Sequence, residues 1–423
     1  LLFDRFLALT LEGSDFTYYT DPLSPSSGMV SGLPVLLADY TFRTKKDVED
    51  YLGILEQTGA YFDALIRYEQ EKSSAGLFMS DTSADNVIEQ CDSIMDPVLL
   101  KDGSHFLQQT FTERLDGLAS DEIITGEEKQ QYIDKNNLLL TTVMAPAYER
   151  VGDAFLVLKG TGTNPYGLCY YPEGKEYYTY LLAQTTGSSR SIPEIRRLLE
   201  KDYQKNFHAL RDLIKNHPGL LKLSPEDFSL SLNMQNSYSD HPEEPGDTDL
   251  PTKPAATSDI LCRLSEAILD DLQKQMKPDF PKLTCIPEAK AGQEHDGESN
   301  SVSCQIKKVS SSMEAYSSPA YYLTPPIDDL WRNTIYLNEP NITDDLTLYT
   351  TLAHEGYPGH LYQTVYSQSF LNQQNASCIR SMLHYGGFVE GWAVYVENLS
   401  YGYAAQLTKN EEAAAYIEAC RLN

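Results

Sequence analysis

The sequence predicts a mainly helical protein with one small β-sheet, and three observations support this α+β assignment. Apolar residues recur at helical spacing, with charged faces between them, over most of the first 160 residues. Three short runs rich in β-branched and aromatic residues follow residue 302. Hydrophobic residues make up 41% of the 423-residue chain and aromatic residues 11%, which is typical of folded globular proteins rather than disordered ones.

The charge balance argues against two classes of partner. The chain has 61 acidic and 33 basic side chains, which give a formal net charge of −28. Phosphate backbones repel such a chain, so we expect neither nucleic acid nor an anionic membrane as a partner. No apolar run approaches the roughly 20 residues of a membrane span, so we expect no transmembrane segment. The start at Leu1 favours a trimmed leader and an extracytoplasmic location, with a cytoplasmic one left open.

The cysteines do not predict a metal cluster or a disulfide scaffold. The seven Cys residues are scattered without a Cys-x-x-Cys pair, which argues against a thiolate zinc cluster and against a disulfide-dense fold. We expect most of them to be buried thiols. Cys285 and Cys304 flank a polar loop and are the pair that an oxidising compartment would allow to form a disulfide.

We divide the chain into three parts, and the first two are mainly helical. Residues 1–160 form a predicted scaffold, with helices at 46–70, 83–100, 103–118 and 126–158. Residues 161–301 begin with a loop of turn formers and a short strand or hairpin at 168–171. Helices are predicted at 191–214, where Ser-Ile-Pro-Glu forms a capping box, and at 260–276. The segments 236–259 and 288–303 are rich in Pro, Gly, Ser and acidic residues and are predicted loops.

The third part, residues 302–423, holds the predicted sheet and the predicted catalytic helices. Strands are expected at 304–309, 320–324 and 334–338, separated by turns that contain Pro and Asp. Thr343-Asp-Asp caps a helix that runs toward His354, and a further helix spans about 387–403.

The segment His354-Glu-Gly-Tyr-Pro-Gly-His360 carries the strongest chemical signal. A His-Glu pair followed by a second His four residues after the first is the signature of zinc hydrolases. Two imidazoles at that spacing converge on one ion, beside a carboxylate that deprotonates water. Here the two His are six residues apart, which on a straight helix separates them by roughly 240° and roughly 9 Å. Pro358 and Gly359 supply a break, so we expect a two-residue bulge that brings His354 and His360 back together.

A third metal ligand is expected from the next helical segment. Glu390 lies 30 positions after His360, and zinc peptidases with two His and one Glu use such a downstream carboxylate. Glu397 is seven residues further along and on the same helical face, so it is either the ligand itself or the partner of a ligand His. His384 is a weaker candidate, because it also fits a surface His at a helix end.

These motifs resemble those of the bacterial domain of unknown function 885 family. The resemblance rests on His354-Glu-Gly-Tyr-Pro-Gly-His-Leu-Tyr-Gln, an HExxPGH-type motif, and extends over most of the chain. Three further segments carry it: Gly167-Leu-Cys-Tyr-Tyr-Pro-Glu-Gly-Lys-Glu-Tyr-Tyr178, Ala320-Tyr-Tyr-Leu-Thr-Pro-Pro326 and Glu390-Gly-Trp-Ala-Val-Tyr395.

The resemblance implies a fold, a cofactor and an activity. Members of this family are placed in the gluzincin, or thermolysin-like, superfamily, which implies a two-lobed helical metallopeptidase fold with a central cleft. It also implies one zinc ion held by His354, His360 and Glu390, with Glu355 as the general base. Such proteins look as though they continue beyond the equivalent of Arg421 into a helical segment with further Arg, Asp and His residues, where a transition-state stabiliser would lie.

The predicted function is a zinc-dependent hydrolase, with a peptide as its substrate. Glu355 would take a proton from a metal-activated water and return it to the leaving amine. The strand at 334–338 would offer an edge to an extended peptide or would simply complete the sheet. Two alternatives stay open: an inactive peptide- or ligand-binding protein, and a hydrolase of non-peptide amides or esters. The candidates for oxyanion donors or cleft-lining residues, which are equally suited to packing, are Tyr177, Tyr178, Tyr321 and Tyr322.

Overall fold

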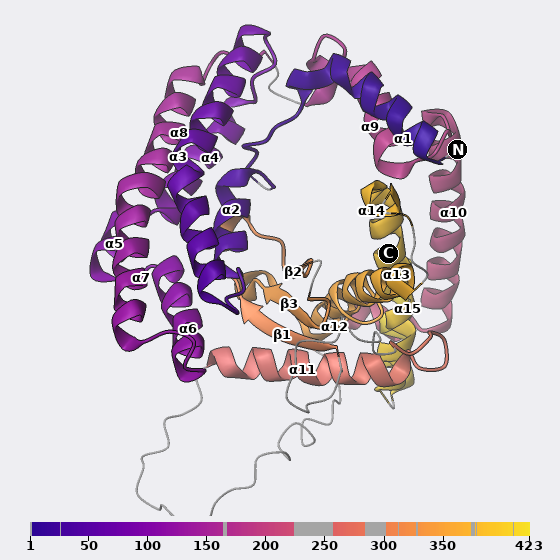
Figure 1. The fold of residues 1–423 in the computed structure, drawn as a ribbon. Helices are drawn as coiled ribbons and strands as arrows, with labels where there is room; N and C mark the ends of the chain where they lie inside the picture. The colour runs from indigo at the N-terminus through magenta and orange to yellow at the C-terminus, as the bar shows by residue number, and fades with distance from the viewer. Residues whose placement is uncertain are drawn as a thin grey trace, which may run out of the picture. The chain divides into compact units, whose positions relative to one another are not determined.

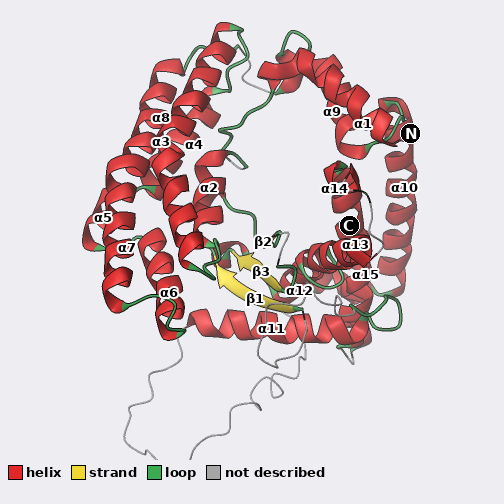
Figure 2. Ribbon diagram, viewed as in Figure 1, coloured by secondary structure: helices red, strands yellow, loops and turns green. Residues whose placement is uncertain are grey.

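The computed structural model describes residues 2–423 except residues 26, 164–166, 224–256, 284–301, 312, 327–328, 374–376, 378 and 409. The described chain forms two compact units. Unit 1 contains Leu1–Phe6, Leu182–Val309 and Ser318–Asn423, and unit 2 contains Leu7–Leu181 and Ser310–Ser317. Helices dominate both, and the strands of the described residues all lie in unit 1 (Figure 2). The predicted fold class, mainly helical with one small sheet, is confirmed.

Unit 2 is built from helices. Its long helix α3 starts at a capping box, in which the Thr44 hydroxyl accepts from the Asp47 N–H and the Asp47 carboxylate accepts from the Thr44 N–H. The helix α1 (Leu2–Glu12) begins in unit 1 and ends in unit 2. The helices of unit 2 are α2 (Met29–Ala38), α3 (Lys45–Ser74), α4 (Asp81–Ile94), α5 (Pro97–Asp102), α6 (Phe106–Ser120), α7 (Gly126–Leu139), α8 (Ala145–Leu158) and the first part of α9 (Gly174–Thr186), all labelled in Figure 1.

The helix predicted at 83–100 is interrupted. It divides into α4 and α5 because Asp96 caps a new helix and Pro97 occupies its first position, where a missing N–H costs nothing. Gly103 then ends α5 in the left-handed conformation, with φ at 81°, so α6 begins at Phe106 rather than at residue 103. The helix predicted at 126–158 runs through as α7, a π-helical turn at Leu140–Met144 and α8.

The predicted strand or hairpin at 168–171 is wrong. Leu168–Tyr170 is a 3₁₀ turn, and α9 starts at Gly174. The backbone turns back on itself here so tightly that a Cβ on Gly174 would lie 1.6 Å from the Leu168 carbonyl oxygen, and only glycine fits. Of the two tyrosines in the predicted strand, Tyr171 packs into a cluster with Phe16 and Tyr177, and Tyr170 is exposed.

Unit 1 contains the sheet and the helices that pack on it. The predicted helices at 191–214, 260–276 and 387–403 are confirmed, with small shifts at their ends. Among the helices that the structure describes, none is long and apolar enough to cross a membrane. The helices are α10 (Ile192–Asn216), α11 (Thr257–Gln275), α12 (Asp345–Glu355), α13 (His360–Gln373), α14 (Ile379–Met382), α15 (Gly386–Gln406) and α16 (Glu411–Leu422).

The sheet has three strands in the order β1-β3-β2. The strands are β1 (Ser303–Lys308), β2 (Ala320–Leu323) and β3 (Arg332–Leu337), as the three predicted runs indicated. β3 pairs in parallel with β1 and antiparallel with β2, so it is the central strand. The prediction that residues 334–338 offer a free edge is therefore wrong. β3 is buried from Asn333 to Leu337 because it is covered on both faces. The edge strands are β1 and β2.

The core of unit 1 positions the predicted site. One row across the sheet, Ile306 on β1, Ile335 on β3 and Tyr322 on β2, faces a continuous apolar cluster. That cluster also contains Leu269 of α11 and Leu352 of α12, together with residues of α13, α15 and α16. The end of α12 is thereby held between the sheet, α11 and α15.

The predicted loops and the predicted disulfide fall largely outside this description. Residues 236–256 and 288–301 lie outside the described residues, and so does Cys285. The pairing of Cys285 with Cys304 therefore stays a prediction.

Candidate functional site

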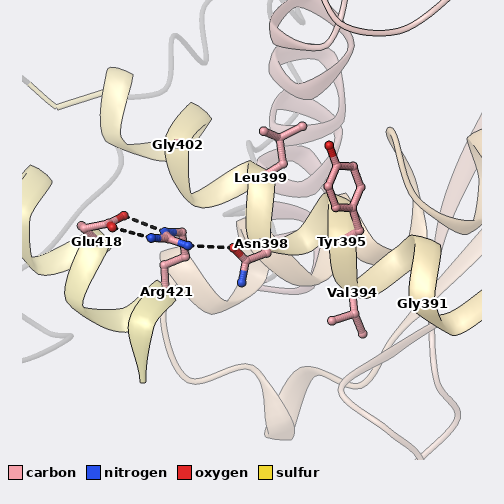
Figure 3. A pocket seen from close by; sticks show the side chains of 8 residues that line it. All are labelled: Gly391, Val394, Tyr395, Asn398, Leu399, Gly402, Glu418 and Arg421. Atoms are coloured by element: carbon pink, nitrogen blue, oxygen red, sulfur yellow. Dashed lines mark hydrogen bonds and ion pairs between the residues drawn. The ribbon is translucent and has the colours of Figure 1, made fainter. Parts of the chain in front are cut away.

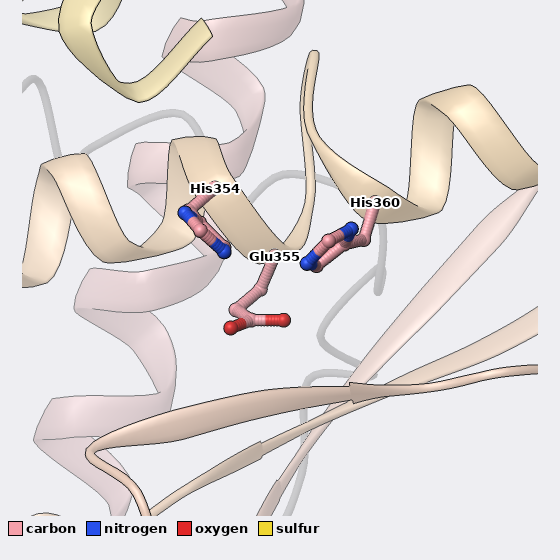
Figure 4. A group of neighbouring side chains, drawn as sticks. All are labelled: His354, Glu355 and His360. Atoms are coloured by element: carbon pink, nitrogen blue, oxygen red, sulfur yellow. The ribbon is translucent and has the colours of Figure 1, made fainter. Parts of the chain in front are cut away.

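The two motif histidines lie on different helices. His354 and Glu355 are the last two residues of α12, and His360 is the first residue of α13. Asp344 caps the start of α12 by accepting from the Thr347 N–H at 2.9 Å. The imidazole rings of His354 and His360 lie 4.8 Å apart, centroid to centroid, and are nearly perpendicular at 85° (Figure 4). The six-residue spacing is thus compatible with two imidazoles at one site.

A tight turn between the helices brings the rings together. The predicted bulge within one continuous helix is wrong. The helix α12 ends at Glu355, and a new helix, α13, starts at His360. The backbone of Gly359 packs against the end of α12, where a Cβ would lie 1.8 Å from the His354 carbonyl oxygen. Only glycine allows this approach. Gly359 therefore helps to bring the two histidines together, as predicted, but it does so in a turn between two helices instead of in a bulge. The Tyr357–Pro358 peptide bond in this turn is cis.

Glu390 faces both histidines from α15. Its Oε2 lies 3.5 Å from His354 Nε2, and its Oε1 lies 3.6 Å from His360 Nε2. The side chain of Glu390 is 63% exposed, whereas those of His354 and His360 are 19% and 12% exposed. One carboxylate therefore spans two imidazole nitrogens on the solvent side of the site.

A second carboxylate, Glu355, also lies beside the imidazoles. Ligand atoms of His354, Glu355 and His360 all lie within 4.8 Å of one another. Glu355 is oriented by the sheet, since its Oε2 accepts the backbone N–H of Tyr322 on β2 at 2.8 Å. Both carboxylates have atoms a metal would bind. Glu390 offers two oxygens that lie 3.5 and 3.6 Å from the two Nε2 atoms, whereas one oxygen of Glu355 is tied to β2.

Glu397 holds the far side of the His354 ring. His354 Nδ1 and Glu397 Oε2 are 2.9 Å apart, and because a carboxylate accepts, Nδ1–H is the donor. This bond leaves the Nε2 lone pair of His354 pointing toward Glu390. Carboxylates in this position orient ligand imidazoles and raise their basicity. Of the two roles left open for Glu397, the geometry favours the partner of a ligand His.

The electrostatics of the site are divided among these groups. Burial alone would lower the pKa of His354, but the hydrogen bond to Glu397 and the charges of Glu355, Glu397 and Glu390 outweigh it, so that pKa is raised. Burial and the neighbouring His354 lower the pKa of His360, against the opposing charge of Glu390. Burial raises the pKa of Glu355 to about 7, in spite of the Tyr322 hydrogen bond. A carboxyl group with a pKa near neutrality suits a general base.

The predicted tyrosines have different positions. The Tyr322 hydroxyl donates to Asn333 Oδ1 at 2.7 Å within the sheet, and burial raises its pKa. The sequence pointed to the Tyr322 hydroxyl as the group at the site, but the group that contacts Glu355 is the backbone N–H of Tyr322. Tyr321 stacks on Tyr336 with ring centroids 5.1 Å apart. In unit 2, Tyr177 is buried in the aromatic cluster and Tyr178 is 46% exposed.

His384 is not part of the cluster. It is exposed in the segment between α14 and α15, outside the group that holds His354, Glu355 and His360. Its position fits the surface histidine that the sequence left as the alternative reading.

A pocket lies on a neighbouring face of α15. Its volume is about 610 Å³, and Val394 and Tyr395 form its apolar wall. Arg421 of α16 closes one end, where it donates to Asn398 Oδ1 at 3.0 Å and pairs with Glu418 (Figure 3). The charges at that end are therefore paired within the protein. The floor includes Gly391 and Gly402, over which a Cβ would meet no atom within 4 Å.

Comparison with known proteins identifies the family. The family described as bacterial protein of unknown function (DUF885) matches residues 2–414, so the chain belongs to that family, as the motifs predicted. Among curated proteins, none matches the chain. The fold is similar to a crystal structure described as that of the putative lipoprotein from Colwellia psychrerythraea, with a TM-score of 0.67 and 19% identity. That match covers 95% of this chain and 62% of the other, so this chain spans less than two thirds of that protein's length.

Proposed function

We propose that this member of the family is a zinc-dependent hydrolase that cleaves peptide bonds. In this proposal His354, His360 and Glu390 hold one zinc ion, and Glu355 is the general base. Two imidazole nitrogens and one carboxylate are a donor set that zinc takes in hydrolases, with one position left for water. The proposal includes the gluzincin-type, two-lobed architecture with a central cleft that the motifs imply.

One observation carries the metal assignment. Two atoms bound to zinc at about 2.1 Å, with a tetrahedral angle between them, lie about 3.4 Å apart. The Glu390 oxygens lie 3.5 and 3.6 Å from the Nε2 atoms of His354 and His360. These separations are longer than ordinary hydrogen bonds and close to the edge of a zinc tetrahedron.

The chemistry then follows from the protein's own groups. Bound zinc supplies a Lewis acid that polarises a carbonyl and lowers the pKa of water. Glu355 takes the proton of the attacking water and returns it to the leaving amine, for which a pKa of about 7 is suitable. The Tyr322 N–H holds Glu355 in place for both transfers. An inactive binding protein would have no use for a base tuned in this way.

The position of β2 supports a peptide as the substrate. β2 is an edge strand, and Tyr322 within it contacts the proposed base. A strand edge can recognise an extended main chain, which peptides have and small esters lack, and β2 would do so beside the Tyr322 N–H that Glu355 occupies. We also propose an extracytoplasmic location, which the description of the structurally similar protein as a putative lipoprotein supports.

The decisive experiment combines metal analysis with a variant of the base. The full chain, purified without chelator, is expected to hold about one zinc ion and to lose peptide cleavage in EDTA. Glu355→Gln should keep the zinc and lower kcat by about 10²- to 10⁴-fold. The matched control is Glu411→Gln, at an exposed position of α16, which should change neither.

Three outcomes would contradict the proposal. Absence of zinc together with unchanged stability in EDTA would remove the metal site. Retained turnover in Glu355→Gln would remove the base. Chelator-sensitive cleavage of ester or non-peptide amide probes, without cleavage of a peptide library, would replace the peptidase by another metal-dependent hydrolase.

A further inference from the structure

A hydrogen bond ties the turn between the two histidines to the helix that carries Glu390. The indole Nε1–H of Trp392 donates to the carbonyl oxygen of Pro358 at 2.8 Å. Pro358 lies in the turn between His354 and His360, and Trp392 follows Glu390 by two residues on α15. This single hydrogen bond therefore links the segment that positions His360 to the helix that positions Glu390.

The two histidines are supported unequally. The His354 ring is fixed through Nδ1 by Glu397 at 2.9 Å. The Nδ1 atom of His360 is buried and has no hydrogen-bond partner among the described residues. The orientation of His360 therefore depends more on the backbone of the turn from which its side chain starts, because no carboxylate or carbonyl group of the described chain accepts a hydrogen bond at Nδ1.

The backbone bonds within the turn hold it to α12 and α13 rather than to α15. The Gly356 N–H donates to Leu352 of α12, and the carbonyls of Gly356 and Gly359 accept from Tyr362 and Gln363 of α13. None of these bonds involves α15. The Trp392 bond supplies the missing constraint in the direction of Glu390.

The indole is itself held in place. Phe280 packs edge-on against Trp392, with ring centroids 5.9 Å apart and an interplanar angle of 80°. Both side chains are partly buried against the apolar cluster of unit 1. A ring confined in this way gives its N–H a fixed direction, so the bond to Pro358 constrains the turn instead of following it.

We infer that Trp392 is a positioning residue for the metal site, which sets the distance between His360 and Glu390 through the carbonyl group of Pro358. This inference rests on the proposed function, because the site that Trp392 serves is the proposed zinc site. Trp392 contacts neither metal nor substrate in this account. Its role is to hold His360 in position, as Glu397 holds His354.

The test is the zinc affinity of the full chain, measured by competition with a chelating dye. Trp392→Phe keeps a ring against Phe280 but removes the donor, and we expect zinc to bind about 10- to 100-fold more weakly, as when other supporting groups of metal ligands are removed. The chain offers a matched control, because it has two Trp residues. Trp331→Phe removes the other indole, before β3, and should leave the affinity within about twofold of the wild type.

A second readout separates positioning from general destabilisation. Co²⁺ is added in place of zinc, and its visible absorption reports the coordination geometry. The spectrum of Trp392→Phe should differ from that of the wild type, and the spectrum of Trp331→Phe should not. Both measurements are made well below the unfolding temperature of each variant, so that a loss of stability alone changes neither.

If Trp392→Phe does not fold, an isosteric replacement decides the question. In the Trp331→Phe background, 3-benzothienylalanine at position 392 replaces the indole N–H by sulfur and keeps the shape of the ring. Zinc binding weakened by tenfold or more supports the inference. A loss of less than tenfold, together with an unchanged Co²⁺ spectrum where that spectrum is measured, overturns it.

The inference and the proposed function fail in different ways. If the wild-type chain binds no zinc, the proposed function falls and the inference falls with it. If the wild type binds zinc and the loss of the indole donor changes neither affinity nor the Co²⁺ spectrum, the inference alone is overturned and the zinc site stands.

Discussion

Each unit gathers ionisable side chains at one place, but the two groups are built differently. In unit 2, the fully buried Lys72 donates to the Thr20 carbonyl at 2.9 Å, bonds to the Asp21 carboxylate and lies 3.9 Å from Glu69. In unit 1, the imidazoles and Glu390 approach one another to 3.5 and 3.6 Å without hydrogen bonds between them. The first group is joined through the Lys72 amine, and in the second two imidazoles face one exposed carboxylate.

The difference separates a structural cluster from a candidate functional one. Burial favours the neutral forms in unit 2, since it raises the pKa of Glu69 and lowers that of Lys72, and of the three side chains only Asp21 reaches solvent, at 39% exposure. In unit 1, Glu390 is 63% exposed and the cluster is open to solvent on that side. Perturbed ionisation alone therefore does not identify a site; convergence of ligand atoms together with access does.

The largest effect is expected in unit 2. Lys72→Met removes the bonds to the Thr20 carbonyl and to Asp21 and leaves the buried Glu69 without its neighbouring amine, and a buried polar group left unpaired costs about 1–3 kcal/mol. Hydrogen exchange of the α3 amides should report this loss as lower protection. Lys46→Met, which breaks an exposed pair with Asp50, is the control and should change little. Equal protection in both variants would mean that burial does not distinguish the two pairs.

The next effect is expected in unit 1, on zinc rather than on stability. Glu397→Gln weakens the support of His354, and zinc affinity should fall about 10- to 100-fold. The neighbouring Asn398 contacts Arg421 instead of the site, so Asn398→Ala should keep the wild-type affinity. Chelator competition measures both. An unchanged affinity in Glu397→Gln would show that the hydrogen bond to His354 does not serve the metal.

The pH dependence should have opposite signs for zinc binding and for stability. His354 binds a metal only when its imidazole is neutral, and the pKa of that imidazole is raised from 6.5. As the pH is lowered, zinc affinity should therefore start to fall while the pH is still above 6.5. In Glu397→Gln the fall should start at lower pH, and coincident profiles would refute the assignment. Without metal, the raised pKa values of His354 and Glu355 contribute stability at low pH. That contribution is lost as pH rises through them, for Glu355 between 4.5 and about 7.

The smallest effect is expected from Glu390 in the metal-free protein. Glu390→Gln removes an exposed carboxylate from a group that already contains Glu355 and Glu397, so the free energy of unfolding should change by less than about 1 kcal/mol. The same variant should lose zinc, because it lacks the third ligand. Denaturant unfolding in EDTA measures the first quantity and metal analysis the second. A large loss of stability would place Glu390 with Lys72, as a structural group.

Local sequence was sufficient for most of the elements of unit 1. The turn-flanked runs of β-branched and aromatic residues became the three strands, and the Asp344 cap and the seven-residue spacing of Glu390 and Glu397 appear as predicted on α12 and α15. These features depend on interactions within a few residues, which a sequence pattern carries directly. In unit 2, the predicted elements were wrong at Leu168–Tyr170 and at the two ends of α5, where one glycine or proline changed the path of the chain.

The sequence by itself determined which groups are available: two imidazoles, the adjacent Glu355 and downstream carboxylates, with Pro358 and Gly359 to break the helix between the imidazoles. Only the tertiary structure decided how they are held. It made β3 the central strand, tied Glu355 to the backbone N–H of Tyr322 and linked Trp392 to Pro358. Main-chain N–H and carbonyl groups occur at nearly every residue, so no residue type marks the ones that a distant side chain will reach.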